Sequence, residues 1–234
     1  MTARAATVDD SAWIVAALNR RREALVEHAP VFWRPAPDAS SRHRAFLVYL
    51  LTEGGAVAYR TDDSVLVAAP HGSGWLVDDF VVDQDTWMID GRALWDAFSR
   101  DRHGSQVRLV CPSYEKARGA FARRVGLTLS ACWWLKELPG SGGGDAGAEV
   151  ALPGAHAVTV AAPPVYAPPG PILFLPVVTD AQQAVPAAVA QAPDLGCAAV
   201  VVNVEPGDAD LTSALTSADF RRHCDYYEGV IRRA

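Results

Sequence analysis

Two groups of polar side chains in this 234-residue sequence have the residue types that acid–base chemistry needs. Asp78 and Asp79 are adjacent in an otherwise apolar stretch, and residues 223–227 (His-Cys-Asp-Tyr-Tyr) form the densest polar-aromatic cluster of the C-terminal part. Groupings of Asp, His and Tyr can transfer protons, although so small a cluster is more typical of an interface or of a satisfied strand edge. Strict alternation along a strand would place Asp78 and Asp79 on opposite faces.

A third candidate is the aromatic loop at residues 30–34, Pro-Val-Phe-Trp-Arg. Phe32 and Trp33 could form the wall of a binding site, with Arg34 available to pair with a carboxylate. The alternative is structural, because the same two aromatic side chains could simply fix the loop to a hydrophobic core. The sequence leaves both interpretations open.

Metal chemistry and several common catalytic motifs find no support in the sequence. The four cysteines are scattered without a CxxC pair, and the histidines show no ligand spacing, so no metal site is predicted. The nucleophile elbow, the P-loop and the dinucleotide-binding fingerprint are also missing.

Composition and charge limit the class of protein further. Half of the residues are apolar, no run of 18 apolar residues occurs, and the N-terminus does not resemble a signal peptide, so we expect a cytoplasmic protein without a membrane partner. The net charge of −6 belongs to residues 141–234, which hold 4 basic and 10 acidic side chains, and this argues against nucleic acid as a partner. The oligomeric state stays open, a homodimer included.

The hydrophobic periodicity predicts the elements that must position these residues. In residues 2–138 the periodicity predicts the element order β-α-α-β-β-β-α-β-α-β. The expected elements are strand 2–7, helices that begin near Asp10 and Ser40, strands 56–60, 64–69 and 75–82, helix 91–101, strand 106–111, helix 114–125 and strand 127–138. After the linker we expect strands 156–162 and 172–178, helix 184–192, strand 197–204, helix 211–218 and a final stretch 220–232.

The glycine-rich run of residues 138–149 predicts a boundary between two domains, because such a composition is typical of a flexible linker. We therefore expect domains at 1–139 and 150–234, joined by residues 140–149. A shift of 93 residues places Val107–Val110 on Val200–Asn203 and Trp133-Trp134 on Tyr226-Tyr227. This echo favours a duplicated unit whose second copy lacks the two N-terminal helices.

The first part resembles the GNAT acetyltransferase superfamily. The resemblance rests on RAATVDDSAWIVAAL (residues 4–18) and on VRLVCPSYEKARGAFARRVGLTLSACWWLKEL (residues 107–138), and it covers residues 2–138 well and 156–232 weakly. It implies an α/β (α+β) fold: a mixed-sheet GNAT-like N-terminal domain plus a truncated second GNAT-like domain.

In that family an acyl-CoA lies in a wedge between two parallel strands, and its pyrophosphate is held by amides at a helix N-terminus. The resemblance implies acetyl-CoA or another acyl-CoA as cofactor, and it assigns residues as follows. The general base, acting directly or through water, is Asp79, with Asp78 beside it; the cofactor-binding residues are Val81, Val82, Gly91 and Arg92; the acceptor site is lined by Phe32, Trp33 and Arg34.

Two positions depart from the family pattern. Of the six residues Thr86–Gly91 that match the pyrophosphate loop, only Gly91 fits, and Asp90 adds a carboxylate where phosphates would lie. The usual tyrosine general acid matches Ala122, which has no proton to donate.

The function that the resemblance implies is acyl-CoA-dependent N-acylation of a small-molecule amine. The alternatives are a non-catalytic GNAT-like binding or scaffold protein, and a GNAT fold used for another reaction on a small metabolite.

Overall fold

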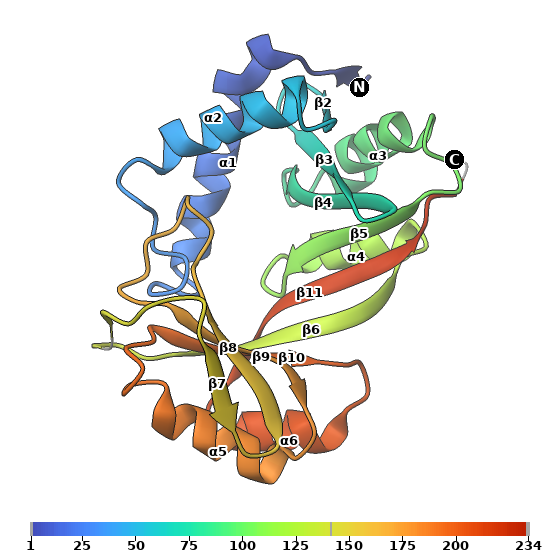
Figure 1. The fold of residues 1–234 in the computed structure, drawn as a ribbon. Coiled ribbons are helices and arrows are strands. Elements are labelled where there is room, and N and C mark those ends of the chain that lie inside the picture. The colour runs from blue at the N-terminus through green and yellow to red at the C-terminus, as the bar shows by residue number, and fades with distance from the viewer. Residues whose placement is uncertain (1, 141, 233–234) are drawn as a thin grey trace. The chain divides into compact units, whose positions relative to one another are not determined.

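The computed structural model describes residues 2–140 and 142–232, and it divides the chain into two compact units (Figure 1). Unit 1 consists of Met1–Arg21, Ser40–Ser130 and Asp225–Ala234, and unit 2 of Arg22–Ala39 and Ala131–Cys224. The two units interleave along the chain. This division differs from the contiguous one, 1–139 and 150–234, that the sequence predicted.

Unit 1 is built on a mixed sheet with the strand order β1-β2-β3-β4-β5-β11. Its elements are β1 (Arg4–Ala5), α1 (Ser11–Val26), α2 (Ala39–Thr52), β2 (Val57–Arg60), β3 (Val65–His71), β4 (Gly74–Val81), α3 (Arg92–Ser99), β5 (Gln106–Pro112), α4 (Lys116–Arg124) and the second half of β11 (Arg221–Val230). Strands β1 to β4 are antiparallel neighbours, whereas β4 and β5 are parallel.

Two hydrophobic clusters hold the helices of unit 1 against its sheet. Ile14 and Leu47, from α1 and α2, pack with Val65 of β3. Leu94 and Phe121, from α3 and α4, belong to a second cluster with residues of β3, β4 and β5. The adjacent β3 residues Val65 and Leu66 belong to different clusters, so the two pairs of helices cover opposite faces of the sheet (Figure 1).

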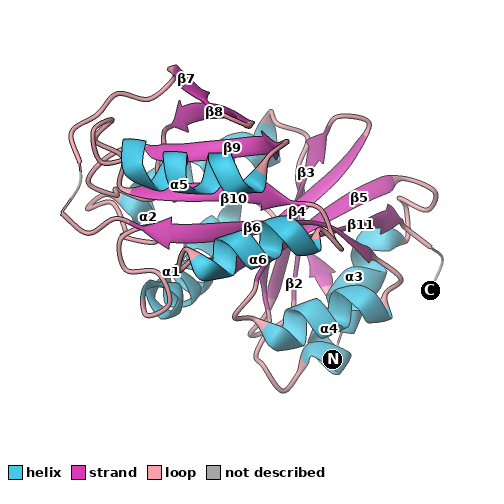
Figure 2. Cartoon of the chain, turned by 90° about the horizontal axis from the view of Figure 1, so that it is seen from below, coloured by secondary structure: helices cyan, strands magenta, loops and turns pink. Residues whose placement is uncertain are grey.

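Unit 2 has a sheet with the order β6-β10-β9-β8-β7 (Figure 2). Its elements are most of β6 (Thr128–Glu137), β7 (Glu149–Leu152), β8 (Ala155–Val160), β9 (Ile172–Val178), α5 (Ala181–Gln191), β10 (Ala199–Val204) and α6 (Ala209–Ser217). Helices α5 and α6 pack in a cluster with Leu173 and Val200. A separate cluster of Ile172 and Val201 is covered by Phe32 and Trp33, from the loop that follows α1.

The glycine-rich run is packed within unit 2 along its described residues, where the sequence predicted a flexible linker. The amide of Gly143 donates to the Pro169 carbonyl (3.2 Å), and the amide of Gly147 donates to the Thr159 carbonyl (2.6 Å). A Cβ added at Gly144 would lie 1.9 Å from the Leu195 carbonyl oxygen. The glycines therefore permit a close backbone approach, which the composition alone does not distinguish from flexibility.

The predicted duplication matches the order of the elements. The series β4-α3-β5-α4-β6 is repeated by β9-α5-β10-α6-β11, and a shift of 93 residues places α4 on α6 (Ala209–Ser217) and β6 on β11 (Arg221–Val230). Each series contains one parallel pair, β4 with β5 and β9 with β10. The second copy lacks the two N-terminal helices, as the sequence predicted.

The two copies exchange their last strands. In unit 2, β6 of the first copy is antiparallel to β10, with Val202 opposite Trp134. In unit 1, β11 of the second copy lies next to β5, and Tyr227 and Ile231 are part of the core there. No described helix is long and apolar enough to cross a membrane.

Candidate functional site

The candidate site of unit 1 lies where the two parallel strands β4 and β5 separate. Their register runs from Trp75 opposite Val107 to Val77 opposite Leu109 and ends there, although β4 continues to Val81 and β5 to Pro112. The backbone groups of β4 beyond Val77 are consequently not used by β5. This gap is the wedge in which the family resemblance places the acyl-CoA.

A β-bulge in β4 lies at the same point and carries the two adjacent carboxylates. Leu66 of β3 faces Phe80, and Ala68 faces Val77, so two residues of β3 span the same length as three of β4. The extra residue lies at Asp78 and Asp79, and it interrupts the alternation that the sequence analysis assumed for this pair.

Asp79 is paired with a histidine from helix α2. His43 Nε2 donates to Asp79 Oδ2 at 3.0 Å, and 9% of the His43 side chain and 25% of the Asp79 side chain remain accessible. Loss of solvent acts to raise the pKa of Asp79, but the hydrogen bond and charge of His43, with the charges of Arg21 and Arg118, hold that pKa below its usual value. Asp79 is therefore kept ionised.

Asp78 is shifted in the other direction. The Asp78 side chain is exposed, but protein atoms around it remove part of its solvent, and this partial desolvation is the main cause that raises the pKa of Asp78. The charge of Asp79 raises that pKa further, while the charges of Arg21 and Arg118 act to lower it. The bulge thus presents one carboxylate that stays ionised and one that accepts a proton more readily.

A network of two arginines and a glutamate lies behind these carboxylates. Arg21 Nε donates to Glu115 Oε1 at 2.6 Å, and Arg118 donates through Nη1 to Glu115 Oε2 at 3.1 Å and through Nη2 to the Asp78 carbonyl at 2.6 Å. The Arg118 side chain is fully buried. Loss of solvent acts to raise the pKa of Glu115, but the charges of Arg21 and Arg118 hold that pKa below its usual value. The network is therefore ionic.

The predicted pyrophosphate loop is helical, and several of its amides are bonded within the chain. Residues Trp87–Gly91 form a π-helical turn that continues into α3. The amides of Ile89 and Asp90 both donate to the Thr86 carbonyl, at 2.9 and 2.8 Å. The amide of Arg92 donates back to the carbonyls of Ile89 and Trp87. Amides that are used within a helix cannot hold an anion.

Aromatic packing fills the space next to this turn. The Trp87 ring lies 4.9 Å from Phe80 and 5.3 Å from Phe121, measured between centroids. A Cβ on Gly91 would lie 2.9 Å from the Trp87 ring. Gly91, predicted to bind cofactor, therefore accommodates an indole in this structure.

The other predicted cofactor residues also have structural contacts. Val81 packs against the cluster under α1 and α2, and Val82 against the cluster under α3 and α4. Arg92 is paired with Asp96, one turn later, at 2.8 Å. Acyl-CoA therefore does not fit the wedge between β4 and β5 in the way that the family resemblance implies. Arg118 is bonded to the Asp78 carbonyl of β4, and the amides of Ile89, Asp90 and Arg92 are bonded within the chain.

The wedge of unit 2 has a comparable obstacle. Strands β9 and β10 separate after Leu175 opposite Val202, and Asn203 Nδ2 donates to the Pro176 carbonyl at 3.3 Å. At the start of α5, Asp180 Oδ1 accepts the amides of Gln182 and Gln183. A carboxylate of the chain itself thus takes the position that a phosphate would need.

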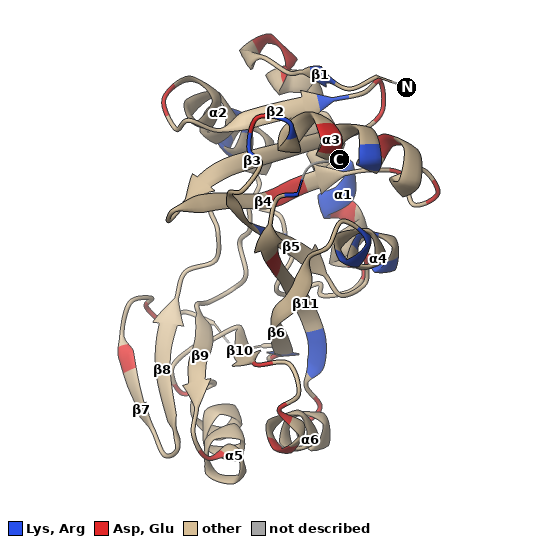
Figure 3. Cartoon of the chain, turned by 90° about the vertical axis from the view of Figure 1, so that its right-hand side faces the viewer, with Lys and Arg blue, Asp and Glu red and all other residues tan. Residues whose placement is uncertain are grey.

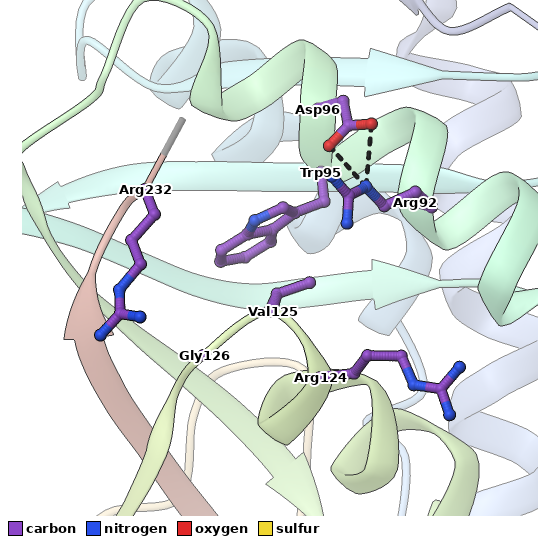
Figure 4. Close-up of a pocket in the computed structure, with 7 residues that line it drawn as sticks. All are labelled: Arg92, Trp95, Asp96, Arg124, Val125, Gly126 and Arg232. Carbon is purple, nitrogen blue, oxygen red and sulfur yellow. Dashed lines mark hydrogen bonds and ion pairs between the residues drawn. The ribbon is translucent and has the colours of Figure 1, made fainter. Parts of the chain in front are cut away.

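A small basic pocket lies beside α3 and α4 (Figure 4). Its volume is about 200 Å³, and it is lined by Arg92, Trp95, Asp96, Arg124, Val125, Gly126 and Arg232. Figure 3 shows that basic residues gather on α4, whereas α5 and α6 have none. Because Asp96 pairs with Arg92, the positive charge of the pocket comes from the other two arginines.

The predicted acceptor residues belong to unit 2, whereas the two carboxylates belong to unit 1. Trp33 stacks on His223 at 4.9 Å, and Phe32 meets the same ring edge-on at 4.6 Å. The backbone of Arg34 accepts the amide of Ala167, so the loop is anchored as well. These contacts match the structural alternative, in which the aromatic side chains fix the loop to a core.

The polar cluster of residues 223–227 is divided between the units. His223 is buried in unit 2, where loss of solvent, with the charge of Arg221, lowers its pKa to about 3. In unit 1 the Tyr227 hydroxyl accepts from Arg123 at 2.6 Å.

Sequence reasoning missed the residues that complete the site: His43, Arg21, Glu115 and Arg118. A signal existed for one pair, because Glu115 and Arg118 are three residues apart at the start of a helix. His43 and Arg21 gave none, since their partners are 36 and 94 residues away. Among the described residues, no group of three His, Cys, Asp or Glu side chains could hold a metal ion.

No protein-family model matches the sequence, and no curated protein matches it. Solved structures do. A proposed acetyltransferase from Thermoplasma acidophilum has a TM-score of 0.53 at 7% identity, over 98% of this chain and 100% of that one. A proposed acetyltransferase from Pyrococcus horikoshii gives 0.49 at 13% identity, over 99% and 90%. A tandem GNAT protein from the clavulanic acid biosynthesis pathway gives 0.46 at 11% identity, over 99% of both chains.

The similarity to the Thermoplasma acidophilum structure extends over 98% of this chain and confirms the predicted α/β fold class. The protein shares the overall fold of that Thermoplasma acidophilum structure, and its second series of elements lacks the two N-terminal helices of the first.

Proposed function

We propose that unit 1 binds an amine-bearing small molecule at the bulge of β4 and removes a proton from its nitrogen, the step that prepares an amine for acyl transfer. The observation that carries the proposal is a pair of adjacent carboxylates at the bulge of β4, next to the point where β4 and β5 separate, one bonded to His43 and the other exposed. Asp79 is held ionised by His43, and Asp78 is exposed with a raised pKa.

The two carboxylates have different roles in this proposal. An ionised carboxylate with a fixed orientation is suited to hold an ammonium group, and this is Asp79. The strength of a general base increases with its pKa, so Asp78 is the better proton acceptor of the two. The sequence analysis assigned the base to Asp79; the electrostatics favour the reverse assignment.

The proton transfer balances within the site. The N–H bond of the bound ammonium breaks, the proton moves to the Asp78 carboxylate, and the electron pair stays on nitrogen. Asp78 is exposed and can return the proton to solvent. The neutral amine is then a nucleophile toward an acyl carbon.

The fold supports acyl transfer as the reaction class, and acyl-CoA is the donor that this fold implies. Because acyl-CoA does not fit the described wedge, the proposal is restricted to the acceptor side. The alternative, a non-catalytic GNAT-like protein that binds amines, is favoured by the same obstruction of the wedge.

Aminolysis of p-nitrophenyl acetate tests the proposal, because this small donor does not need the wedge. We expect the protein to accelerate the acetylation of one or more amines in a panel. Asp78→Asn should lower kcat by about 10²–10⁴, with a smaller loss at a pH that deprotonates the amine unaided. Asp79→Asn should mainly raise KM for the amine.

The exposed Asp85→Asn is the matched control and should leave both constants unchanged. An Asp78→Asn protein that is as active as the parent would exclude Asp78 as the base. Amines that bind by calorimetry but are not acetylated would leave the non-catalytic alternative.

A further inference from the structure

Arg118 crosses the gap between the two parallel strands of unit 1. It belongs to the first turn of α4, which follows β5 in the chain, and its Nη2 reaches the Asp78 carbonyl of β4 at 2.6 Å. The last paired residues of the two strands are Val77 and Leu109, so this carbonyl is the next one beyond the point of separation. The guanidinium thus takes the place of the missing strand pairing.

The position of Arg118 is fixed by charge as well as by hydrogen bonds. Its Nη1 donates to Glu115, which is held in turn by Arg21, and the whole Arg118 side chain is buried. A buried arginine that lost Glu115 would be an uncompensated charge, so the anchor is necessary. Arg118 Nε is buried and has no hydrogen-bond partner among the described residues.

We infer that Arg118 is a built-in occupant of this wedge and excludes a linear amide-bearing ligand arm, such as the pantetheine of acyl-CoA, from unit 1. The arm would need the same space and the same carbonyl acceptor. An acyl donor for the proposed amine site therefore has to be small enough to react without entering the wedge. This inference concerns the donor side only, so it stands or falls separately from the proposed role of Asp78.

Binding of S-acetyl-pantetheine to the full chain, measured by calorimetry, tests the inference. This probe has the arm but no phosphates, so it reports on the wedge and not on the start of α3. We expect the parent protein to show no saturation up to millimolar concentration, and Arg118→Ala to bind about tenfold more tightly or better. Arg118→Met fills the space without a donor, and it should behave as the parent does.

A second variant keeps the test decisive if Arg118→Ala is poorly folded, and a competition experiment adds a check where it is folded. Glu115→Gln weakens the anchor and leaves the arginine in place, so it should bind the probe more tightly than the parent and less tightly than Arg118→Ala. Ethylguanidinium should occupy the vacated space in Arg118→Ala and compete with the probe. Micromolar binding by the parent, or a folded Arg118→Ala with no gain over the parent, would overturn the inference.

Discussion

At the scale of single residues, the environment decides what each ionisable side chain can do. Asp78 and Asp79 are chemically identical neighbours, yet their pKa values move in opposite directions because only Asp79 accepts a hydrogen bond from His43. The two carboxylates are thereby separated into an anion and a proton acceptor.

The pH dependence of activity should reflect this separation. A rate that requires ionised Asp78 falls as the pH drops through the raised pKa of that group, so the acid limb should lie above the usual range of an aspartate. Asp78→Asn should abolish this limb in a pH profile of kcat/KM for aminolysis. A limb that is unchanged in Asp78→Asn would assign it to another group.

His223 should make the stability of the protein depend on pH. Its pKa is lowered to about 3 from an ordinary value of 6.5, so between these values the unfolded chain binds more protons than the folded one. Stability from this group is present above pH 6.5 and is lost as the pH falls, by up to about 1.4 kcal/mol per pH unit.

Urea denaturation between pH 5 and 7 measures this contribution. His223→Phe and His223→Gln both remove the titration, one with an aromatic ring and one with a polar group. Both should flatten the pH dependence, whatever they do to the stability itself. A slope that persists in both variants would show that His223 is not its source.

At the scale of elements, packing and internal hydrogen bonds hold the π-helical turn before α3, where the family resemblance implied an anion-binding loop. Trp87 packs with Phe80 and Phe121, and the amides of Ile89 and Asp90 are bonded to the Thr86 carbonyl. The absence of a side chain at Gly91 leaves room for the Trp87 ring beside it.

Gly91→Ala should consequently destabilise the protein. The added methyl group would lie 2.9 Å from the Trp87 ring, and overpacking of this kind costs about 1–3 kcal/mol. In a Trp87→Phe background the smaller ring leaves room, so the same substitution should cost less. A double-mutant cycle of thermal or urea unfolding measures the coupling, and additive effects would contradict the steric explanation.

At the scale of the whole molecule, the exchange of the last strands makes each unit depend on a distant part of the chain. Tyr227 and Ile231 complete the core of unit 1, although they lie about 100 residues after Leu129, which packs against the same cluster. The two halves of the sequence are therefore not two independent modules.

A chain of residues 1–139 alone should fail to fold stably. It contains the predicted first domain but lacks the strand that lies next to β5. Fusing residues 221–232 to its C-terminus should restore cooperative unfolding, as measured by circular dichroism, while a fusion of scrambled sequence should not. Cooperative unfolding of 1–139 by itself would contradict this dependence.

The sequence by itself determined the elements and their order. Local periodicity located β9 at Ile172–Val178 without error and most other elements within a few residues, but it missed β7 (Glu149–Leu152) at the end of the glycine-rich run. The shift of 93 residues matched α4 with α6 and β6 with β11. Periodicity is a property of neighbouring residues, so a sequence displays it directly. The same local view identified Asp78 and Asp79 as the acidic pair.

Only the tertiary structure decided what surrounds that pair and which strand completes each unit. The bulge depends on the register with β3, His43 and Arg21 arrive from other helices, and Arg118 reaches across from α4 to the backbone of β4. The sequence does not reveal the exchange of β6 and β11, because each strand follows a helix at the end of a series of elements in the same order. Local periodicity therefore cannot tell which series each strand completes. Contacts between segments far apart in sequence are selected by the free energy of the complete fold, which no local pattern records.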